Sequence, residues 1–200
     1  MALYLGSDSQ SSTYFGSVKH IVTSKTSVRS LYSLKCPKTF KNEYVDTGLK
    51  LGEYDMDYTI CIDIGSSTPS NTSTIFGYMY EVSPWPGLVV RYSGTTGING
   101  LVGSTTVFSA NAKHFGKFVV TRDVYNKTYN TYWLEGDQLR SSSKVMEFAP
   151  SIQSLVIGCS MKPNGEGQRY FDGTLNFFNV YSKLFSSDRI ETFLKKGVIV

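Results

Sequence analysis

The stretch that decides the fold is Tyr170-Phe-Asp-Gly-Thr-Leu-Asn-Phe-Phe-Asn-Val-Tyr-Ser-Lys-Leu-Phe-Ser-Ser-Asp-Arg-Ile-Glu-Thr-Phe-Leu-Lys-Lys-Gly197. From residue 173 onward its side chains alternate with a period of two, which predicts a β-strand. The two predicted faces are Gly173, Leu175, Phe177, Asn179 and Tyr181 on one side and Thr174, Asn176, Phe178 and Val180 on the other.

A short helix is predicted to follow this strand. Asp188 stands at an N-cap position with Glu191 three residues later, the spacing of a capping box. An apolar stripe with helical spacing comes next, and Gly197 is a suitable stop signal. The stripe consists of Ile190, Phe193 and Leu194.

Upstream of this ending the chain contains a series of short apolar segments separated by Gly, Pro, Asn and Ser. Alternation is clearest in 58–64, where Tyr58, Ile60, Ile62 and Ile64 oppose Thr59, Cys61 and Asp63. Close spacing of strands with few helical patterns is typical of an antiparallel sandwich. The further segments are 75–82, 88–92, 102–109, 117–122, 130–134, 154–158 and 172–181. We therefore predict an all-β, antiparallel β-sandwich with one short C-terminal α-helix.

Composition fits one globular domain. The 200 residues are 40% hydrophobic and 18% charged, which excludes a disordered chain. Residues 1–35 are rich in Ser and Thr and are predicted to be a lead or connector, with room for one strand, whereas 36–200 are predicted to form the β domain.

Several classes of function find no support in the sequence. The net charge of +4 is mild and basic and acidic residues are mixed, so no nucleic-acid surface is predicted. No segment has the length of a transmembrane helix, and the N-terminus lacks the pattern of a signal peptide. The cysteines, Cys36, Cys61 and Cys159, have neither disulfide nor zinc spacing, which favours buried thiols in a protein made in a bacterial cytoplasm.

Four segments in order carry a resemblance to a known family. They are Asp46-Thr-Gly-Leu-Lys-Leu with Tyr58-Thr-Ile-Cys-Ile-Asp, Gly116-Lys-Phe-Val-Val-Thr-Arg-Asp with Tyr132-Trp-Leu-Glu-Gly136, Leu155-Val-Ile-Gly158, and Phe171-Asp-Gly-Thr-Leu with Ser187-Asp-Arg-Ile-Glu. Together they resemble the concanavalin A-like lectin/glucanase jelly roll in its laminin-G-like form, over about residues 40–197. The resemblance implies a jelly-roll sandwich, a core position for Trp133, and carbohydrate binding. Calcium sites occur in such domains, and Asp123, Asn126 and Asp172 have suitable side chains, but their spacing does not specify a metal, so no cofactor is predicted.

The opening Met1-Ala-Leu-Tyr-Leu-Gly-Ser7 is similar to the N-termini of tail and baseplate proteins of phages and prophages of Firmicutes. This similarity implies a virion component that helps a tail engage the surface of its host. Glycans of that surface are then the expected partners, together with other virion proteins or further copies of the chain.

Glycanases also use this jelly roll, and their retaining members carry Glu-x-Asp-x-x-Glu on one strand, with two carboxylates on one face. The nearest string here, Glu53-Tyr-Asp-Met-Asp-Tyr58, lacks the last Glu and precedes the strand. His20 and His114 are isolated from any nucleophile motif. We therefore predict that the chain is not an enzyme.

Sugar binding requires an aromatic face that stacks on a pyranose and polar groups that bind its hydroxyls. Trp85, between Pro84 and Pro86, either serves as such a face or packs over the sandwich edge. The loop 123–130 is polar and aromatic and is expected to be exposed, unless it is a plain hairpin connection. A third polar loop is 163–169. The predicted carbohydrate site consists of Trp85, Asp123, Tyr125, Asn126 and Tyr129.

The sequence thus predicts a non-catalytic, lectin-like domain that recognises host cell-surface glycans as part of a phage or prophage tail. The first alternative is an assembly domain of a virion that binds no ligand. The second is a divergent glycanase that uses Glu53 and Asp55.

Overall fold

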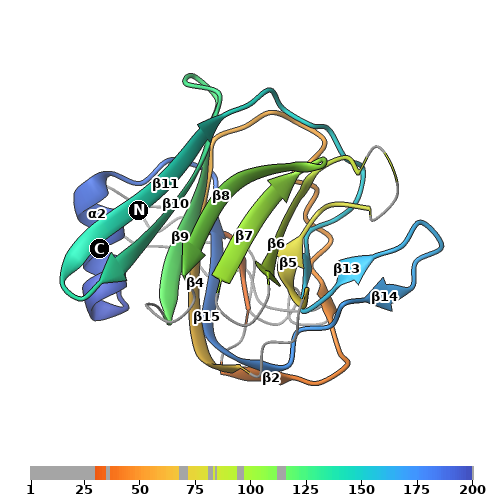
Figure 1. Cartoon of the computed structure of the whole chain (residues 1–200), viewed down its shortest axis with the longest axis horizontal. Coiled ribbons are helices and arrows are strands. Elements are labelled where there is room, and N and C mark those ends of the chain that lie inside the picture. Colours follow the sequence, from red (N-terminus) through yellow and green to blue (C-terminus); the bar gives the residue numbers. More distant parts are fainter. Residues whose placement is uncertain are drawn as a thin grey trace, which may run out of the picture.

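The computed structural model describes residues 30–34, 37–67, 72–80, 83, 85–93, 97–111 and 116–199. Within these residues the chain folds into two large antiparallel sheets that pack face to face, with one helix and one small hairpin outside them (Figure 1). The predicted antiparallel β-sandwich with a short C-terminal helix is therefore confirmed.

One sheet has seven strands in the described residues. Its order is β1-β15-β4-β9-β10-β11, and β2 also pairs with β15. The strands are β1 (Ser30–Ser33), β2 (Lys38–Phe40), β4 (Tyr58–Ser67), β9 (Lys117–Asp123), β10 (Thr128–Glu135), β11 (Gln138–Val145) and β15 (Gly173–Tyr181).

The other large sheet has six strands in the same part of the chain, in the order β3-β12-β5-β6-β7-β8. These are β3 (Val45–Asp46), β5 (Thr74–Gly77), β6 (Leu88–Ser93), β7 (Gly97–Val102), β8 (Thr105–Asn111) and β12 (Val156–Ile157). A separate hairpin consists of β13 (Ser160–Met161) and β14 (Gly167–Gln168). It lies next to the six-stranded sheet, because Cys159 and Met161 pack with Val156 of β12.

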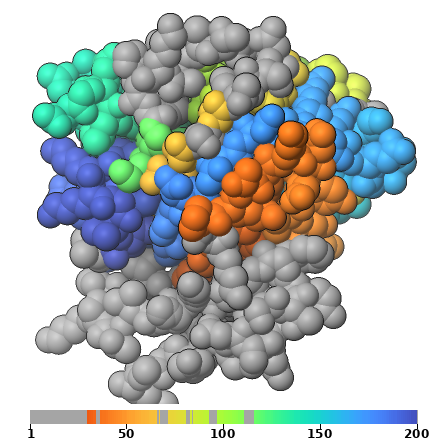
Figure 2. Space-filling model, turned by 90° about the horizontal axis from the view of Figure 1, so that it is seen from below, coloured from red at the N-terminus to blue at the C-terminus, as the bar shows by residue number. Residues whose placement is uncertain are grey.

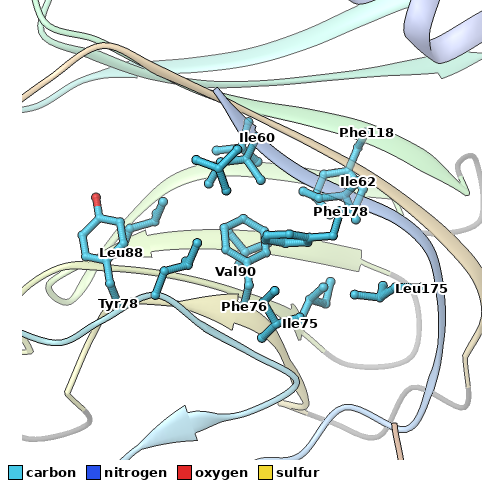
Figure 3. Packing of buried hydrophobic residues seen from close by; sticks show 14 of the residues in the cluster. Ile60, Ile62, Ile75, Phe76, Tyr78, Leu88, Val90, Phe118, Leu175 and Phe178 are labelled. Carbon is cyan, nitrogen blue, oxygen red and sulfur yellow. The ribbon is translucent and has the colours of Figure 1, made fainter. Parts of the chain in front are cut away.

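The main core lies between the two sheets. Side chains from the seven-stranded sheet meet side chains from the six-stranded sheet, as Figure 3 shows. The first group includes Ile60, Ile62, Phe118 and Phe178, and the second includes Ile75, Phe76, Tyr78, Leu88 and Val90. All nine are fully buried or nearly so, and the alternation predicted for 58–64 is confirmed. Trp133 packs against this core, as its predicted core position requires, but is only partly buried.

Helix α2 (Ser187–Lys196) covers the outer face of the seven-stranded sheet. Its predicted stripe is buried against Cys61 and Val119, and Gly197 ends the helix in a left-handed conformation (φ 71°). The predicted N-cap was wrong. The cap is Ser186, whose extended backbone lets its Oγ accept from the amide of Arg189. Asp188 lies inside the first turn instead, where a negative charge complements the helix dipole.

Strand β15 departs from strict alternation. Leu175 packs in the main core on the same side as Phe178 and Val180, whereas Phe177 and Tyr181 face helix α2. The predicted grouping of Leu175 with Phe177 was therefore wrong. Its cause is a β-bulge, because the register between β15 and β4 shifts between Leu175 and Phe177. One extra residue in a strand reverses the faces on either side of it.

The N-terminal part of the domain lies along β15. Ser30–Ser33 form β1, which pairs with β15. Seen from below, the orange atoms of the β2 region lie against blue atoms of the C-terminal part (Figure 2), in agreement with the pairing of Thr39 with Thr174. Residues 1–29, including His20, lie outside the described residues, as do Cys36 and His114, so the predicted boundary at residue 35 stays a prediction.

Five connections meet at one end of the sandwich, toward the top of Figure 1. We call this the loop end and define it by residues 47–57, 78–80, 83, 85–87, 103–104, 124–127 and 146–155. Hydrogen bonds join neighbouring connections: Ser151 N donates to Gly52 O (2.8 Å), Met146 N to Lys127 O (2.8 Å), and Gly103 N to Gly87 O (3.4 Å). In the part of the chain that the structure describes, no helix has the length and apolar character needed to cross a bilayer.

Candidate functional site

A pocket of about 440 Å³ lies on the outer face of the six-stranded sheet, next to the loop end. It is formed where β6 and β7 meet the segments after β5 and β14. Leu88, Val90 and Tyr92 of β6 face the core, so Val89 and Arg91 project from the opposite face. The described residues that line the pocket are Met79, Trp85, Val89, Arg91, Leu101, Gly103, Ser104 and Arg169. Its volume lies within the range of about 300–1,000 Å³ that is typical of ligand sites.

Two arginines from distant parts of the sequence meet at this pocket. Arg91 lies opposite Thr74 in the pairing of β5 with β6. Arg169 follows β14, and its carbonyl oxygen accepts a hydrogen bond of 2.7 Å from the amide of Thr74. Thr74 therefore brings both arginine backbones to one edge of the pocket. Arg91 and Arg169 thus bring two positively charged side chains to the lining of the pocket.

The pocket also contains unusual backbone conformations. Among the described residues, five that are not glycine have a positive φ, and two of these, Trp85 (φ 52°) and Arg169 (φ 53°), line the pocket. Such conformations are unfavourable for L-residues and are concentrated at functional sites. Gly87, at φ 100°, lets the segment of Trp85 lie close to Tyr78, since a Cβ there would lie 2.3 Å from the carbonyl oxygen of Tyr78. The chain thus holds Trp85 at the pocket in a conformation that its own preferences disfavour.

The predicted site residues do not come together in this pocket. Trp85 lines it and is 40% exposed. Asp123, Tyr125 and Asn126 lie instead at the β9–β10 turn. There Asp123 accepts hydrogen bonds from the backbone and the side-chain amide of Asn126, at 2.9 and 2.8 Å, which stabilises the turn. Tyr125 is 93% exposed. A binding role for these three residues stays a prediction.

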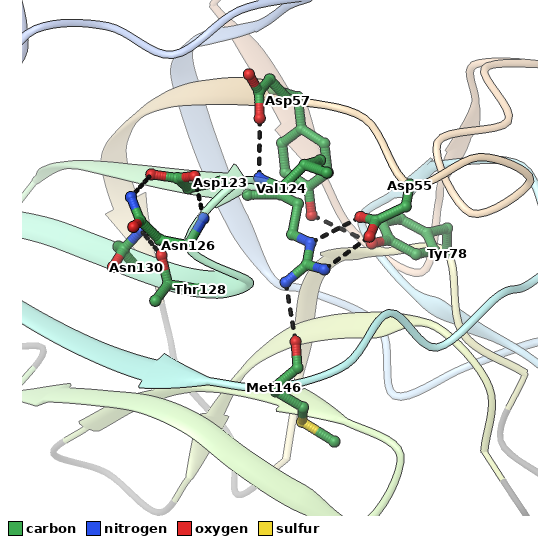
Figure 4. Close-up of polar contacts among 11 residues, drawn as sticks. Asp55, Asp57, Tyr78, Asp123, Val124, Asn126, Thr128, Asn130 and Met146 are labelled. Carbon is green, nitrogen blue, oxygen red and sulfur yellow. Dashed lines mark hydrogen bonds and ion pairs between the residues drawn. The ribbon is translucent and has the colours of Figure 1, made fainter.

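Tyr129 is fully buried, so the expectation that it lies in an exposed loop was wrong. It belongs to β10, where its ring packs in the main core and lies 4.6 Å from the guanidinium carbon of Arg122. Figure 4 shows the surrounding polar contacts. Arg122 is also fully buried; it donates twice to Asp55, each at 2.9 Å, and once to the carbonyl oxygen of Met146 at 3.0 Å. Sequence patterns alone do not show that this hairpin starts inside the core.

The acidic string 53–57 has structural contacts. Asp55 binds Arg122, Asp57 accepts from the amide of Val124 at 2.9 Å, and Glu53 forms an ion pair with Lys50 at 2.8 Å. Asp55 and Asp57 thus hold the segment before β4 to residues 122 and 124, whereas Glu53 pairs with Lys50 of the same segment.

The cysteine thiols and the acidic side chains were also compared with the requirements of a metal site. Cys61 and Cys159 are buried free thiols, as predicted, and burial raises the pKa of Cys159 to about 12. In the described ranges no group of three or more His, Cys, Asp and Glu side chains is arranged to hold a metal ion.

Reasoning from the sequence missed Arg91 and Arg169 as site residues. Arg91 gives one usable signal, because a single charge interrupts the apolar run 88–92 at a position that alternation places on the outer face. Arg169 gives none, since only the tertiary bond between its carbonyl and Thr74 brings it to the same place.

Comparison with known proteins adds information on the fold. No family model and no curated protein matches the sequence. Among solved structures, the CBM40 of the Ruminococcus gnavus IT-sialidase aligns with a TM-score of 0.56 at 14% identity, over 80% of this chain and 98% of that chain. The chain shares this β-sandwich fold.

Larger proteins contain a similar domain. The NanB sialidase from Streptococcus pneumoniae, in its K499G mutant, aligns with a TM-score of 0.56 at 14% identity, over 78% of this chain. A leech intramolecular trans-sialidase aligns with a TM-score of 0.55 at 12% identity, over 80% of this chain. The present chain spans only 27% of the length of each of these two proteins. The likeness shows the β-sandwich fold.

Proposed function

We propose that this protein is a non-catalytic carbohydrate-binding domain that holds an acidic sugar in the Trp85 pocket. The observation that carries the proposal is the meeting of Trp85, Arg91 and Arg169 around one pocket of about 440 Å³. A guanidinium group binds a carboxylate through two parallel hydrogen bonds, which gives geometric selectivity as well as attraction. An indole face packs against the apolar face of a pyranose ring. Together these groups suit a sugar that carries a carboxylate.

The comparisons support this choice of ligand. Structures of the Ruminococcus gnavus CBM40 are described as bound to α2,3 and α2,6 sialyllactose. The sialic acid unit of these sugars carries a carboxylate. A sialic acid or a similar acidic sugar is therefore the ligand class that we propose for the present chain.

Binding of α2,3-sialyllactose and of lactose, measured by calorimetry or by NMR titration, tests the proposal. We expect weak binding of sialyllactose and no binding of lactose. Arg91→Gln and Arg169→Gln should each reduce the affinity at least about tenfold, the loss of one charged hydrogen-bonding partner. Trp85→Ala should reduce it roughly threefold to tenfold, the loss of one aromatic contact. Arg140→Gln, in an ion pair that is about half exposed, is the matched control. Equal binding of both sugars would exclude the role of the arginines, and no binding on an array of acidic and neutral glycans would exclude carbohydrate recognition.

We also propose that this domain acts in host recognition by a phage or prophage tail. The support is the similarity of Met1–Ser7 to the N-termini of such tail proteins. A shallow sugar site binds weakly, and many copies on one particle would supply the avidity that adsorption needs. Purified protein, made multivalent, should then compete with phage particles for host cells. If it does not compete while it still binds glycans in solution, the proposed setting is wrong.

A further inference from the structure

The loop end carries most of the large apolar side chains that are exposed. Among the described residues seven large hydrophobic side chains are classed as exposed, and five of them lie in the loop end or at the last residue of β11 beside it. These are Tyr54 (69%), Trp85 (40%), Tyr125 (93%), Val145 (69%) and Ile152 (73%). Exposed aromatic and aliphatic groups that gather at one end of a soluble domain indicate a surface that binds something.

Three of these side chains stand on loops that touch one another. Ser151 donates its amide proton to Gly52, and a Cβ at Gly52 would lie 2.5 Å from the carbonyl oxygen of Ser151. A Cβ at Gly87 would lie 3.0 Å from the Cβ of the same Ser151. The loops that carry Tyr54, Trp85 and Ile152 therefore meet around Ser151. The residues in contact, Gly52, Gly87 and Ser151, are at most two positions in sequence from these three side chains.

Polar groups accompany the aromatic ring of Tyr54. Lys50 and Glu53 form an ion pair of 2.8 Å, with side chains that are 53% and 30% exposed. Tyr54 directly follows Glu53 in the chain, and the hydrogen bond and the charge of Glu53 raise the pKa of Lys50. An exposed aromatic face next to a donor and an acceptor is the combination that binds a neutral pyranose.

We propose that Tyr54, Ile152 and the Lys50–Glu53 pair form a second subsite that binds the sugar units next to the acidic sugar. This inference rests on the proposed function, because the acidic sugar in the Trp85 pocket orients the rest of the chain. Trp85 lines the pocket, and the loop that carries it lies against Ser151, the neighbour of Ile152. The ligand is then an oligosaccharide of at least three units with its acidic sugar at one end.

Ligands of increasing length test the second subsite. N-acetylneuraminic acid, α2,3-sialyllactose and a sialylated pentasaccharide would be titrated into the full chain and into Tyr54→Ala, Ile152→Ser and Glu53→Gln. For the unaltered chain we expect the affinity to rise with ligand length. Tyr54→Ala should lose roughly threefold to tenfold in affinity for the pentasaccharide, the usual contribution of one aromatic contact, and nothing for the monosaccharide. Val198→Ser, another exposed apolar side chain (50%) outside the loop end, is the control.

Each outcome of this experiment has a separate meaning. If all three ligands bind with equal affinity, or if Tyr54→Ala and Ile152→Ser bind the pentasaccharide as the unaltered chain does, the second subsite is excluded and the pocket remains. If none of the ligands binds, the proposed sialic acid pocket is excluded and the subsite with it. A melting temperature unchanged in the variants shows that any loss comes from contact, as the exposure of Tyr54 and Ile152 leads us to expect.

Discussion

Arg122 offers the sharpest test of how the loop end is held. Its guanidinium group is fully buried, binds both carboxylate oxygens of Asp55 and the carbonyl of Met146, and packs over Tyr129. Arg122→Met keeps the volume of the stem but removes the charge and all donors. Asp55 then loses its charge partner and the Met146 carbonyl its donor.

The expected cost follows from these contacts. Removal of one partner of a buried ion pair costs about 3–5 kcal/mol. The side chain of Asp55 is still 32% exposed, so water can take over part of its solvation and the lower end applies. We expect a loss of about 3 kcal/mol in the free energy of unfolding. In a domain of this size that loss lowers the melting temperature by roughly 6–12 °C.

Urea and thermal unfolding of single and double variants measure this loss. Asp55→Asn alone should cost at least as much as Arg122→Met, because it leaves a fully buried guanidinium group without its counter-charge. The double variant should lose less than the sum of the two, since the pair acts as a unit. Arg140→Met, whose ion pair with Glu135 is about half exposed, should change stability by less than about 1 kcal/mol. The reasoning is refuted if Arg122→Met costs no more than Arg140→Met, or if the two losses at the buried pair are additive.

Three further predictions concern stability. Burial raises the pKa of Tyr58 well above its ordinary value of 10.0, so its contribution to stability is complete below pH 10 and is lost as the pH rises above that value. In unfolding measured against pH, Tyr58 should contribute up to about 1.4 kcal/mol per pH unit to the slope above pH 10, and Tyr58→Phe should remove that part. Ser186→Ala should cost about 1 kcal/mol and Asp188→Ala about half as much, and the reverse order would contradict the cap assigned to Ser186. Gly87→Ala should cost about 2 kcal/mol or more in urea unfolding, because its positive φ and the 2.3 Å approach to Tyr78 leave no place for a Cβ; a neutral result would show that the segment of Trp85 can shift.

Much of the fold could be predicted because local patterns determine it. The alternation from Tyr58 to Ile64 reports burial between two layers directly, and the stripe of α2 reports its contact with the sheet. The sequence pattern fails where an extra residue enters a strand. The bulge before Phe177 places Leu175 on the core face of β15, and no side chain of the strand indicates the bulge in the sequence. The cap at Ser186 was missed because Asp188 fits the same motif two residues later.

The candidate site depends on a different kind of information. Its two arginines are 78 positions apart by their numbers (169 − 91), and they meet because both backbones flank Thr74. Such a meeting follows from strand order, which no local pattern contains. Tyr129 also depends on strand pairing. Its polar and aromatic neighbours in the sequence predict an exposed loop, but the pairing of β10 with β9 buries it.

The buried contacts of Arg122 link the fold to the proposed binding surface. β9 ends at the loop end, and a hydrophobic side chain at position 122 would leave the Met146 carbonyl without a donor and Asp55 without a counter-charge. With arginine at this position, the segment before β4 and the segment after β11 are both fixed to the end of β9. The same two segments carry Tyr54 and Ile152, the exposed side chains of the second subsite. Arg122 thus positions the proposed binding surface without contacting a ligand, so its loss should weaken binding of the long oligosaccharide more than binding of the monosaccharide.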